Sequence, residues 1–417
     1  MTAPQECCAD YEVSRRSVLK AAGLAGMAGV VTSMFGDVMT STVFGSGESN
    51  ILVVVSLRGG ADGLSMVVPH AEPAYYAARP TTAIAPSRLL FPDATFGLHP
   101  AFAALSPAWL LGQVAVVHAT GMAVPNRSHF EAMEAVEDAD PGTAARVGWL
   151  NRMIGGLATS PDLFDGVSLG NAIMPTALQG PSPALATEEF ASLRGPFATD
   201  PVLRKRITDS LHTQYRKHGG LVGRAGVGAL ALTQRASAIA GTIDDGPHSG
   251  ALYPKDSSLS EALKTTAGLI RAGVGVKAVA VDSGGWDQHV ELGYRVDMTI
   301  KDLAKSLAAF FVDLGPHAGR VTVVTVSEFG RRLQENGAGG VDHGYGNMML
   351  VMGGGVKGGR YYSRWPGLSA GKQVDGDLAV TTDYRSVLAE ILRSRFSALN
   401  TSKIFPGLSY DPLGFMS

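Results

Sequence analysis

Carboxylates and imidazoles follow several apolar runs of this 417-residue sequence. In chain order they are Asp62, Asp287, His289, Glu328, Asp342 and His343. Oxygen and nitrogen donors without sulfur suit zinc, manganese, magnesium or calcium. Two such ions about 4 Å apart can clamp the attacking and leaving oxygens of a displacement at phosphorus or sulfur. We therefore expect a divalent metal site. Asp287 and His289 are two positions apart, so their side chains point the same way if the segment is extended and opposite ways if it is helical.

Ser128 could supply the nucleophile for such a displacement. It stands where a loop gives way to a predicted helix over 128–137, so its hydroxyl could face an anion at the helix N-terminus. Arg127 and Arg331 could hold that anion, because a guanidinium matches its geometry.

The same residues also have structural explanations. Ser128 has the spacing of a capping box, and Asp62 and His343 lie in glycine-rich segments that are typical of turns. Glu328 and Arg331 could form an ion pair that closes a loop. The convergence of these side chains therefore matters more than any single one.

Apolar β-branched runs and helical periodicity alternate along the chain. Strands are predicted over 51–55, 114–117, 276–281 and 321–326, and helices over 99–111, 128–137, 294–314 and 383–395. This alternation predicts an α/β fold with a doubly wound, mostly parallel sheet. Ligands bind outside the carboxyl ends of such strands, where the candidate residues stand. We expect His118 to face the sheet interior and His99 to help start a helix, both outside the site.

The chain is longer than the roughly 250 to 300 residues of one usual core. The strand–helix rhythm weakens over about 158–257, which predicts an inserted cap or second lobe. No fixed-period repeat is visible. The net charge of −2 and the absence of a long basic run argue against nucleic acid as the main partner.

The N-terminus has the pattern of a targeting segment. Arg15 and Arg16 precede a short, glycine-rich apolar run over 21–31. We expect residues 1–45 to direct export through the twin-arginine translocase, which would place domain 46–417 in the periplasm or outside the cell. Cys7 and Cys8 precede the arginine pair, so the mature protein would lack cysteine. No later segment offers the roughly 20 apolar residues of a membrane span.

Several sequence blocks resemble a known family. They are SLRGGADGLSMVVP, LHPAFAAL, QVAVVHATGM, PNRSHFEAME, GGWDQH, VSEFGRRLQENGAGGVDHGYGN, MGGGVKGG and TTDYRSVLAEIL, and they span nearly the whole chain. They resemble the twin-arginine-exported bacterial family catalogued as domain of unknown function 1501. That family looks similar to the alkaline phosphatase and sulfatase superfamily.

The resemblance implies a metal-dependent site on an alkaline phosphatase-like fold. By position, Asp62 resembles the first ligand, Ser128 the nucleophile, Asp287 and His289 a ligand pair, Glu328 a later ligand, and His343 the last histidine. The superfamily usually has Asp-His directly after the later strand, whereas this chain has Glu328 there and reaches Asp342 and His343 only afterwards. The number of metal ions that the site would bind, two, one or none, is therefore left open by the sequence.

Two functions remain in competition. The first is an exported metal-dependent hydrolase of phosphate or sulfate esters, with a small anionic ester as substrate. The second is a non-catalytic exported protein that keeps the fold as a binding or assembly module, for example for a polysaccharide. A nucleotide-binding oxidoreductase has little support, because the spacing around 353–355 is not the dinucleotide fingerprint.

Overall fold

The structure is a computed structural model that describes residues 49–417, apart from 125, 141–145, 158–161, 191–199, 219, 241–242 and 245. The predicted targeting segment, with its arginine pair and both cysteines, lies outside the described residues. Among the described helices, none combines the length and apolar character that crossing a bilayer requires.

A nine-stranded sheet forms the centre of the molecule. Its order is β12-β4-β11-β8-β1-β7-β5-β6, and β13 pairs with β4. The strands are β1 (Ile51–Leu57), β4 (Val114–Gly121), β5 (Gly166–Leu169), β6 (Leu185–Thr187), β7 (Ala278–Ser283), β8 (Val321–Val326), β11 (Asn347–Gly353), β12 (Arg360–Tyr362) and β13 (Thr382–Asp383). β11 is antiparallel to both neighbours, and the other pairs are parallel. The predicted mostly parallel α/β sheet is confirmed.

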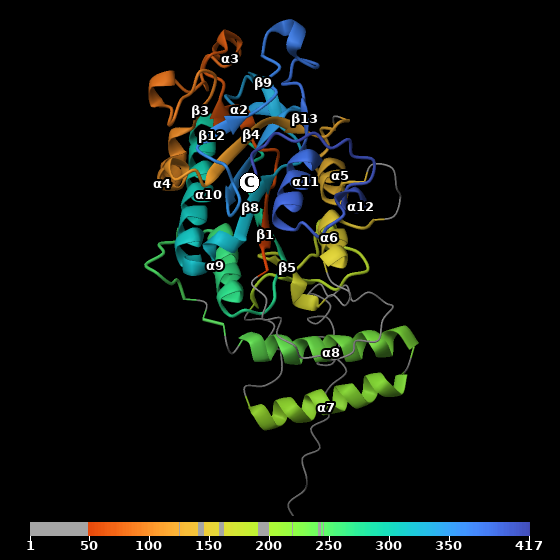
Figure 1. Cartoon of the computed structure of the whole chain (residues 1–417). Coiled ribbons are helices and arrows are strands. Elements are labelled where there is room, and N and C mark those ends of the chain that lie inside the picture. The colour runs from red at the N-terminus through yellow and green to blue at the C-terminus, as the bar shows by residue number, and fades with distance from the viewer. Residues whose placement is uncertain are drawn as a thin grey trace, which may run out of the picture.

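Helices cover both faces of this sheet. The first face carries α9 (Ser258–Arg271) and α10 (Leu292–Leu314); the second carries α5 (His129–Asp138), α6 (Trp149–Leu157), α11 (Tyr384–Arg395) and α12 (Thr401–Ile404) (Figure 1). Alternate residues of β1 serve the two layers: Val53 packs in the core with α9 and α10, and Val54 packs with α6 and α11. The sheet is therefore doubly wound, as predicted.

Further short elements lie outside the central sheet. They are α2 (Gly63–Met66), β2 (Val67–Val68), α3 (Pro73–Ala78), β3 (Gly97–Leu98), α4 (Ser106–Leu110), β9 (Arg331–Glu335) and β10 (Val341–His343). β2 pairs with β3, and β9 with β10, as separate two-stranded ribbons. Short 3₁₀ segments span Pro86–Arg88, Pro100–Leu105, Leu163–Asp165, Thr176–Leu178, Gly315–Arg320 and Ala370–Lys372. The predicted helix over 99–111 is thus a 3₁₀ turn followed by α4.

The range 158–257, expected as an insertion, is divided in the structure. Strands β5 and β6 belong to the central sheet, whereas helices α7 (Pro201–His218) and α8 (Gly220–Ala240) lie beyond one end of it (Figure 1). The two strands have only four and three residues, so they leave no long apolar run for sequence analysis to detect.

Two histidines are buried without belonging to the candidate site. His118 on β4 approaches the Val67 carbonyl oxygen with Nε2 at 3.0 Å and accepts a bond from the Ala119 N–H at Nδ1. His99 accepts a hydrogen bond from the Ala101 N–H at the start of a 3₁₀ turn. Burial lowers the pKa of each imidazole to about 4. Both are therefore neutral in the folded protein at neutral pH.

We predict that His118→Gln weakens the dependence of stability on pH between about 6.5 and 4. The unfolded state takes up a proton at an ordinary histidine pKa near 6.5, whereas the folded state resists protonation down to about 4, so acid favours unfolding in this window. Glutamine does not titrate, so the slope of the unfolding free energy against pH should decrease by an amount that corresponds to the uptake of up to one proton on unfolding. Urea denaturation at several pH values measures that slope, and an unchanged slope in a natively folded variant contradicts the prediction.

Candidate metal centre

Four parts of the chain meet at the carboxyl edge of the sheet. The loop after β7 brings Asp287 and His289, and the segment after β8 brings Glu328. Helix α5 begins at His129, and β10 ends at His343. The α/β topology therefore gathers residues that are up to about two hundred positions apart in the chain, as expected for this edge of a parallel sheet.

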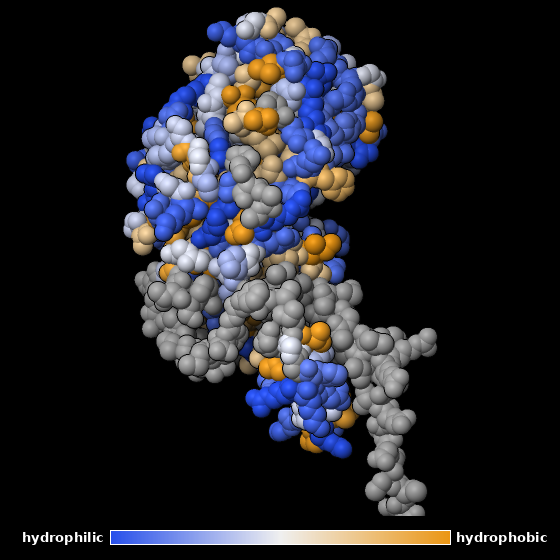
Figure 2. Space-filling model, turned by 90° about the vertical axis from the view of Figure 1, so that its right-hand side faces the viewer, coloured by the Kyte–Doolittle hydropathy of each residue, from blue (hydrophilic) through white to orange (hydrophobic). Residues whose placement is uncertain are grey.

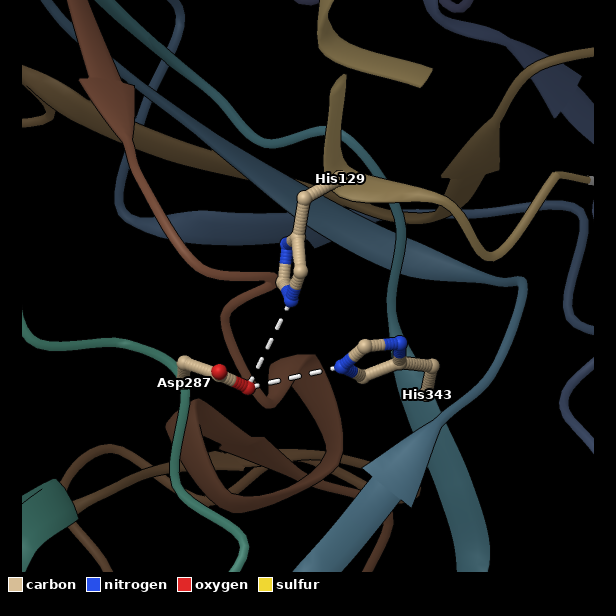
Figure 3. Close-up of side chains that lie close together, drawn as sticks. All are labelled: His129, Asp287 and His343. Atoms are coloured by element: carbon tan, nitrogen blue, oxygen red, sulfur yellow. Dashed lines mark hydrogen bonds and ion pairs between the residues drawn. The ribbon is translucent and has the colours of Figure 1, made fainter. Parts of the chain in front are cut away.

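Three imidazoles surround one carboxylate oxygen. Asp287 Oδ1 lies 2.9 Å from His289 Nε2, 3.4 Å from His343 Nε2 and 3.6 Å from His129 Nε2. Figure 3 shows His129 and His343 pointing at this oxygen from two directions. The nearest ligand atoms of His129, Asp287 and His343 all lie within 4.8 Å of one another, which is a spacing that suits a shared metal ion.

The other ring nitrogen of each imidazole has a fixed partner. His129 Nδ1 lies 3.0 Å from Glu328 Oε1, and His289 Nδ1 lies 2.9 Å from Asp342 Oδ1. His343 Nδ1 lies 2.9 Å from the Arg127 carbonyl oxygen. Because these partners are acceptors, each Nδ1 is assigned as the N–H donor, which leaves a lone pair on each Nε2. Partners of this kind orient metal-bound histidines in proteins.

The Nε2 atoms have little donor support from the protein: Arg331 Nη1 lies 3.4 Å from His289 Nε2, at the long limit of a hydrogen bond. His289 Nε2 and His343 Nε2 face each other at 3.0 Å, where two lone pairs repel unless a proton or a metal cation lies between them. His129 Nε2 is buried and makes no hydrogen bond to any described residue. Burial also lowers the pKa of His343, which favours its neutral, ligating form. The residues present therefore fit a divalent cation.

Arg331 fixes the position of Asp287. Its guanidinium is fully buried and donates to Asp287 Oδ1 at 2.6 Å, to the Gly60 carbonyl at 2.6 Å and to the Val341 carbonyl at 2.9 Å. Burial raises the pKa of the Asp287 carboxyl, but Arg331 outweighs burial and the pKa lies below its usual value. Asp287 is therefore ionised at neutral pH. Arg331, predicted to hold a substrate anion, instead has its N–H groups directed at protein acceptors.

Arg127 likewise has protein partners. Its Nη2 forms an ion pair with Asp377, and its guanidinium carbon lies 4.1 Å from the centre of the Tyr345 ring. Its Nε is buried without a hydrogen-bond partner among the described residues. The backbone carbonyl of Arg127, which sequence reasoning did not consider, is the group that orients His343.

Asp62 does not join the cluster. Its two oxygens pair with the buried Arg79 guanidinium, at 2.5 Å from Nη1 and 3.0 Å from Nη2. Arg79 also donates to the Leu333 carbonyl in β9, so the pair ties α2 and α3 to that ribbon. Burial raises the pKa of Asp62, but Arg79 outweighs burial and holds it below the usual value. Asp62, expected as the first metal ligand, is thus engaged in a structural ion pair. The sequence does not predict this pair, because Arg79 lies seventeen residues away in a segment without a recognisable pattern.

Ser128 precedes the cluster at the N-cap of α5. Its side chain makes no capping hydrogen bond, while its backbone N–H donates to Asn126 Oδ1 at 2.7 Å. Glu131 accepts from the Asn126 amide at 3.3 Å, so the capping box suggested by the spacing is not formed. The Ser128 side chain is exposed and its hydroxyl is not used as a helix cap.

His129 is the residue of the centre that sequence reasoning passed over. It directly follows Ser128 at the start of a predicted helix, so its position beside a candidate nucleophile was the available signal. Its role depends on Glu328, which lies 199 residues away and accepts from both His129 and the Gly59 N–H at 2.8 Å. The structure brings Glu328 and Asp342 into contact with imidazoles, and Asp287, His289 and His343 into the cluster itself.

Gly59 allows the loops to approach closely. Its φ of +116° is a conformation that side chains rarely adopt, and an added Cβ would lie 2.4 Å from the Asp287 backbone nitrogen. A larger residue at this position would push the Asp287 segment away from the strand β1 edge.

A family model and two solved structures are similar to this chain. The model described as "Protein of unknown function (DUF1501)" matches residues 119–389. The lipoteichoic acid synthase LtaP from Listeria monocytogenes is 9% identical with a TM-score of 0.33, covering 82% of this chain and 73% of its own. A TAB5 alkaline phosphatase mutant with bound Mg is 11% identical with a TM-score of 0.29, covering 73% of this chain and 91% of its own. Among curated proteins there is no match.

We predict that Glu328→Gln weakens metal binding by about tenfold or more, because the neutral amide makes His129 a less basic and less firmly oriented ligand. Isothermal titration with zinc or manganese on metal-stripped protein measures the affinity. Glu335→Gln is a matched control, since Glu335 accepts hydrogen bonds from Thr81 and Thr82 and has no contact with the imidazoles. Equal affinities of the Glu328 variant and the control would contradict the prediction.

Proposed function

This chain belongs to the DUF1501 family of proteins of unknown function, and we propose that it is an exported metal-dependent hydrolase of phosphate or sulfate esters. The observation that carries the proposal is the convergence of three Nε2 lone pairs on Asp287 Oδ1, with each Nδ1 held by an acceptor. Export is part of the proposal because of the arginine pair in the N-terminal segment.

His129, Asp287 and His343 would hold the metal ion, with His289 as a fourth donor. Imidazole nitrogens favour zinc or manganese over calcium, which prefers oxygen ligands. When bound, a divalent ion supplies Lewis-acid polarisation of an ester oxygen. Arg331 keeps Asp287 ionised and in place, and Glu328 and Asp342 keep two imidazoles oriented.

Ser128 would attack the central phosphorus or sulfur atom. Its exposed hydroxyl precedes α5, whose N-terminal N–H groups and dipole favour an anionic ester. A bond would form between the serine oxygen and the central atom while the bond to the leaving oxygen breaks. Water would then release phosphate or sulfate from the serine. The chain's contribution is mainly to position and to stabilise charge.

A non-catalytic binding or assembly module is the second candidate. The observation that favours it is that both predicted anion-binding arginines are engaged: Arg127 with Asp377 and Arg331 with Asp287. An esterase needs positive charge beside the substrate anion. Arg127 and Arg331 do not provide it, because each is paired with a carboxylate, so the charge would have to come from a metal ion. Metal binding is therefore the property that distinguishes the hydrolase from the non-catalytic binding module.

Metal content provides the first test. We expect the purified protein, prepared without chelator or affinity metal, to contain about one equivalent of zinc or manganese by elemental mass spectrometry. Asp287→Ala and His343→Ala should lose it, because each removes a converging ligand atom. Asp244→Ala and His248→Ala are matched controls from another Asp–His pair, 2.9 Å apart, and should retain the metal. A folded wild-type protein that takes up no added metal would sink the hydrolase proposal.

Ser128→Ala provides the second test. If Ser128 is the nucleophile, hydrolysis of aryl phosphates or aryl sulfates should fall by at least about a thousandfold while metal content is unchanged. Ser369→Ala is the control, because Ser369 is also an exposed N-cap residue without a capping hydrogen bond. Undiminished hydrolysis by Ser128→Ala would remove this residue from the mechanism, and a metal-loaded protein without any esterase activity would favour the binding module.

A further inference from the structure

Helices α7 and α8 form a hairpin at one end of the molecule. Figure 1 shows them side by side below the sheet, with α8 nearer to it, while α2 and β9 lie at the other end. The described part of α8 is anchored to the body: Ala236 and Ile239 enter the core, and Arg235 pairs with Asp162. α8 thus lies between the body and α7.

Close packing holds α7 against α8. The Tyr215 ring of α7 lies over Gly226 of α8, where an added Cβ would meet the ring at 2.2 Å. Gly223 is similarly close to the Tyr215 carbonyl oxygen, at 2.5 Å from an added Cβ. Because glycine allows this approach, α7 is docked on one side and leaves its opposite side to solvent.

The solvent side of α7 is strongly basic. The helix carries Arg204, Lys205, Arg206, Arg216 and Lys217, and its one acidic residue is Asp209. Asp209 pairs with Lys205 at 2.6 Å, and the side chains of Arg206, Arg216 and Lys217 are exposed. The sequence of α8 contains no acidic residue. Since the whole chain has a net charge of −2, this positive charge is a local feature.

Exposed aliphatic side chains accompany the charge at the start of α7 and at the start of α8. Val202 is 68% exposed beside Arg204–Arg206, and Val222 at the start of α8 is 71% exposed just after Arg216 and Lys217. In Figure 2 the hairpin is the lowest coloured part, and its surface is strongly hydrophilic with hydrophobic atoms scattered among it. A soluble polyanion would use the charge alone, whereas a lipid surface uses both kinds of side chain.

We propose that the α7–α8 hairpin docks on a membrane surface that carries anionic phospholipids. The cations of α7 contact the headgroups, and Val202 and Val222 enter the boundary between headgroups and acyl chains. Figure 1 shows the hairpin beyond the end of the sheet opposite α2 and β9, and β9 pairs with the strand that carries His343, so docking through the hairpin leaves the metal centre away from the membrane. The inference does not depend on the proposed hydrolase activity.

Vesicle co-sedimentation of the full chain tests this surface. At low salt the protein is expected to bind vesicles of equal parts phosphatidylglycerol and phosphatidylcholine, to bind phosphatidylcholine vesicles much less, and to dissociate as salt is raised. The double variant Arg216→Gln/Lys217→Gln should bind anionic vesicles about thirtyfold more weakly, from the usual attraction of two cations near such a surface. The wild-type chain and its variants all carry the same N-terminal segment, so any contribution of that segment to vesicle binding cancels in the comparison.

Lys301→Gln/Lys305→Gln is the matched control, because it removes the same amount of positive charge from exposed positions on α10, away from the hairpin. It should change binding less than about twofold. Equal losses in the two double variants, or equal binding to neutral vesicles, would overturn the proposal. Binding to a soluble polyanion such as heparin without binding to vesicles would also overturn it and identify a polyanion partner instead. Val202→Ser/Val222→Ser should weaken binding to anionic vesicles at low salt without changing the charge, and unchanged binding would rule out insertion of these side chains.

Discussion

The buried guanidinium of Arg331 is the constraint on which the edge of the sheet depends. A charge without access to water must be fully paired, and here it is satisfied by the Gly60 and Val341 carbonyls and the Asp287 carboxylate. These acceptors belong to the loop after β1, the β9–β10 ribbon and the loop after β7. One side chain of the β9–β10 ribbon therefore joins that ribbon to two loops that carry or border the imidazole cluster.

The central fold could be predicted because long β-branched runs have few alternatives to a buried strand. β1, β4, β7 and β8 each arise from such a run, and the helices flanking them follow apolar periodicity. The missing strands are of another kind. β5 and β6 are very short, and β11 contains several methionines in place of β-branched residues. Their strand character comes from neighbours in the sheet and not from local sequence.

The candidate centre could be predicted as a set of donor types but not as a set of contacts. Asp287 and His289 follow β7, whose carboxyl end lies at the same edge as those of β1 and β8, and the ribbon that carries His343 follows β8, so topology brings the three together. Asp62 follows a strand too, yet the nearby Arg79 engages it. The pairing of His129 with Glu328 joins positions 199 residues apart and has no local trace in the sequence. Side-chain partners, unlike strand ends, require the folded coordinates.

The two-stranded ribbon of β9 and β10 limits how this protein can change over evolutionary time. Asp342 and His343 are consecutive, and they approach the two ring nitrogens of His289: Asp342 lies at Nδ1, and His343 lies at Nε2 within the cluster. The pairing of the ribbon is irregular between Val341 and His343, so inserting or deleting a single residue in β10 would move at least one of these side chains away from His289. The turn over 336–340 is constrained as well, because Asn336 donates to the His289 carbonyl and to Asp342, and an added Cβ on Gly340 would lie 2.0 Å from the His289 backbone. Relatives that retain the centre should therefore keep both the length of this ribbon and the Asn336 and Gly340 positions of its turn.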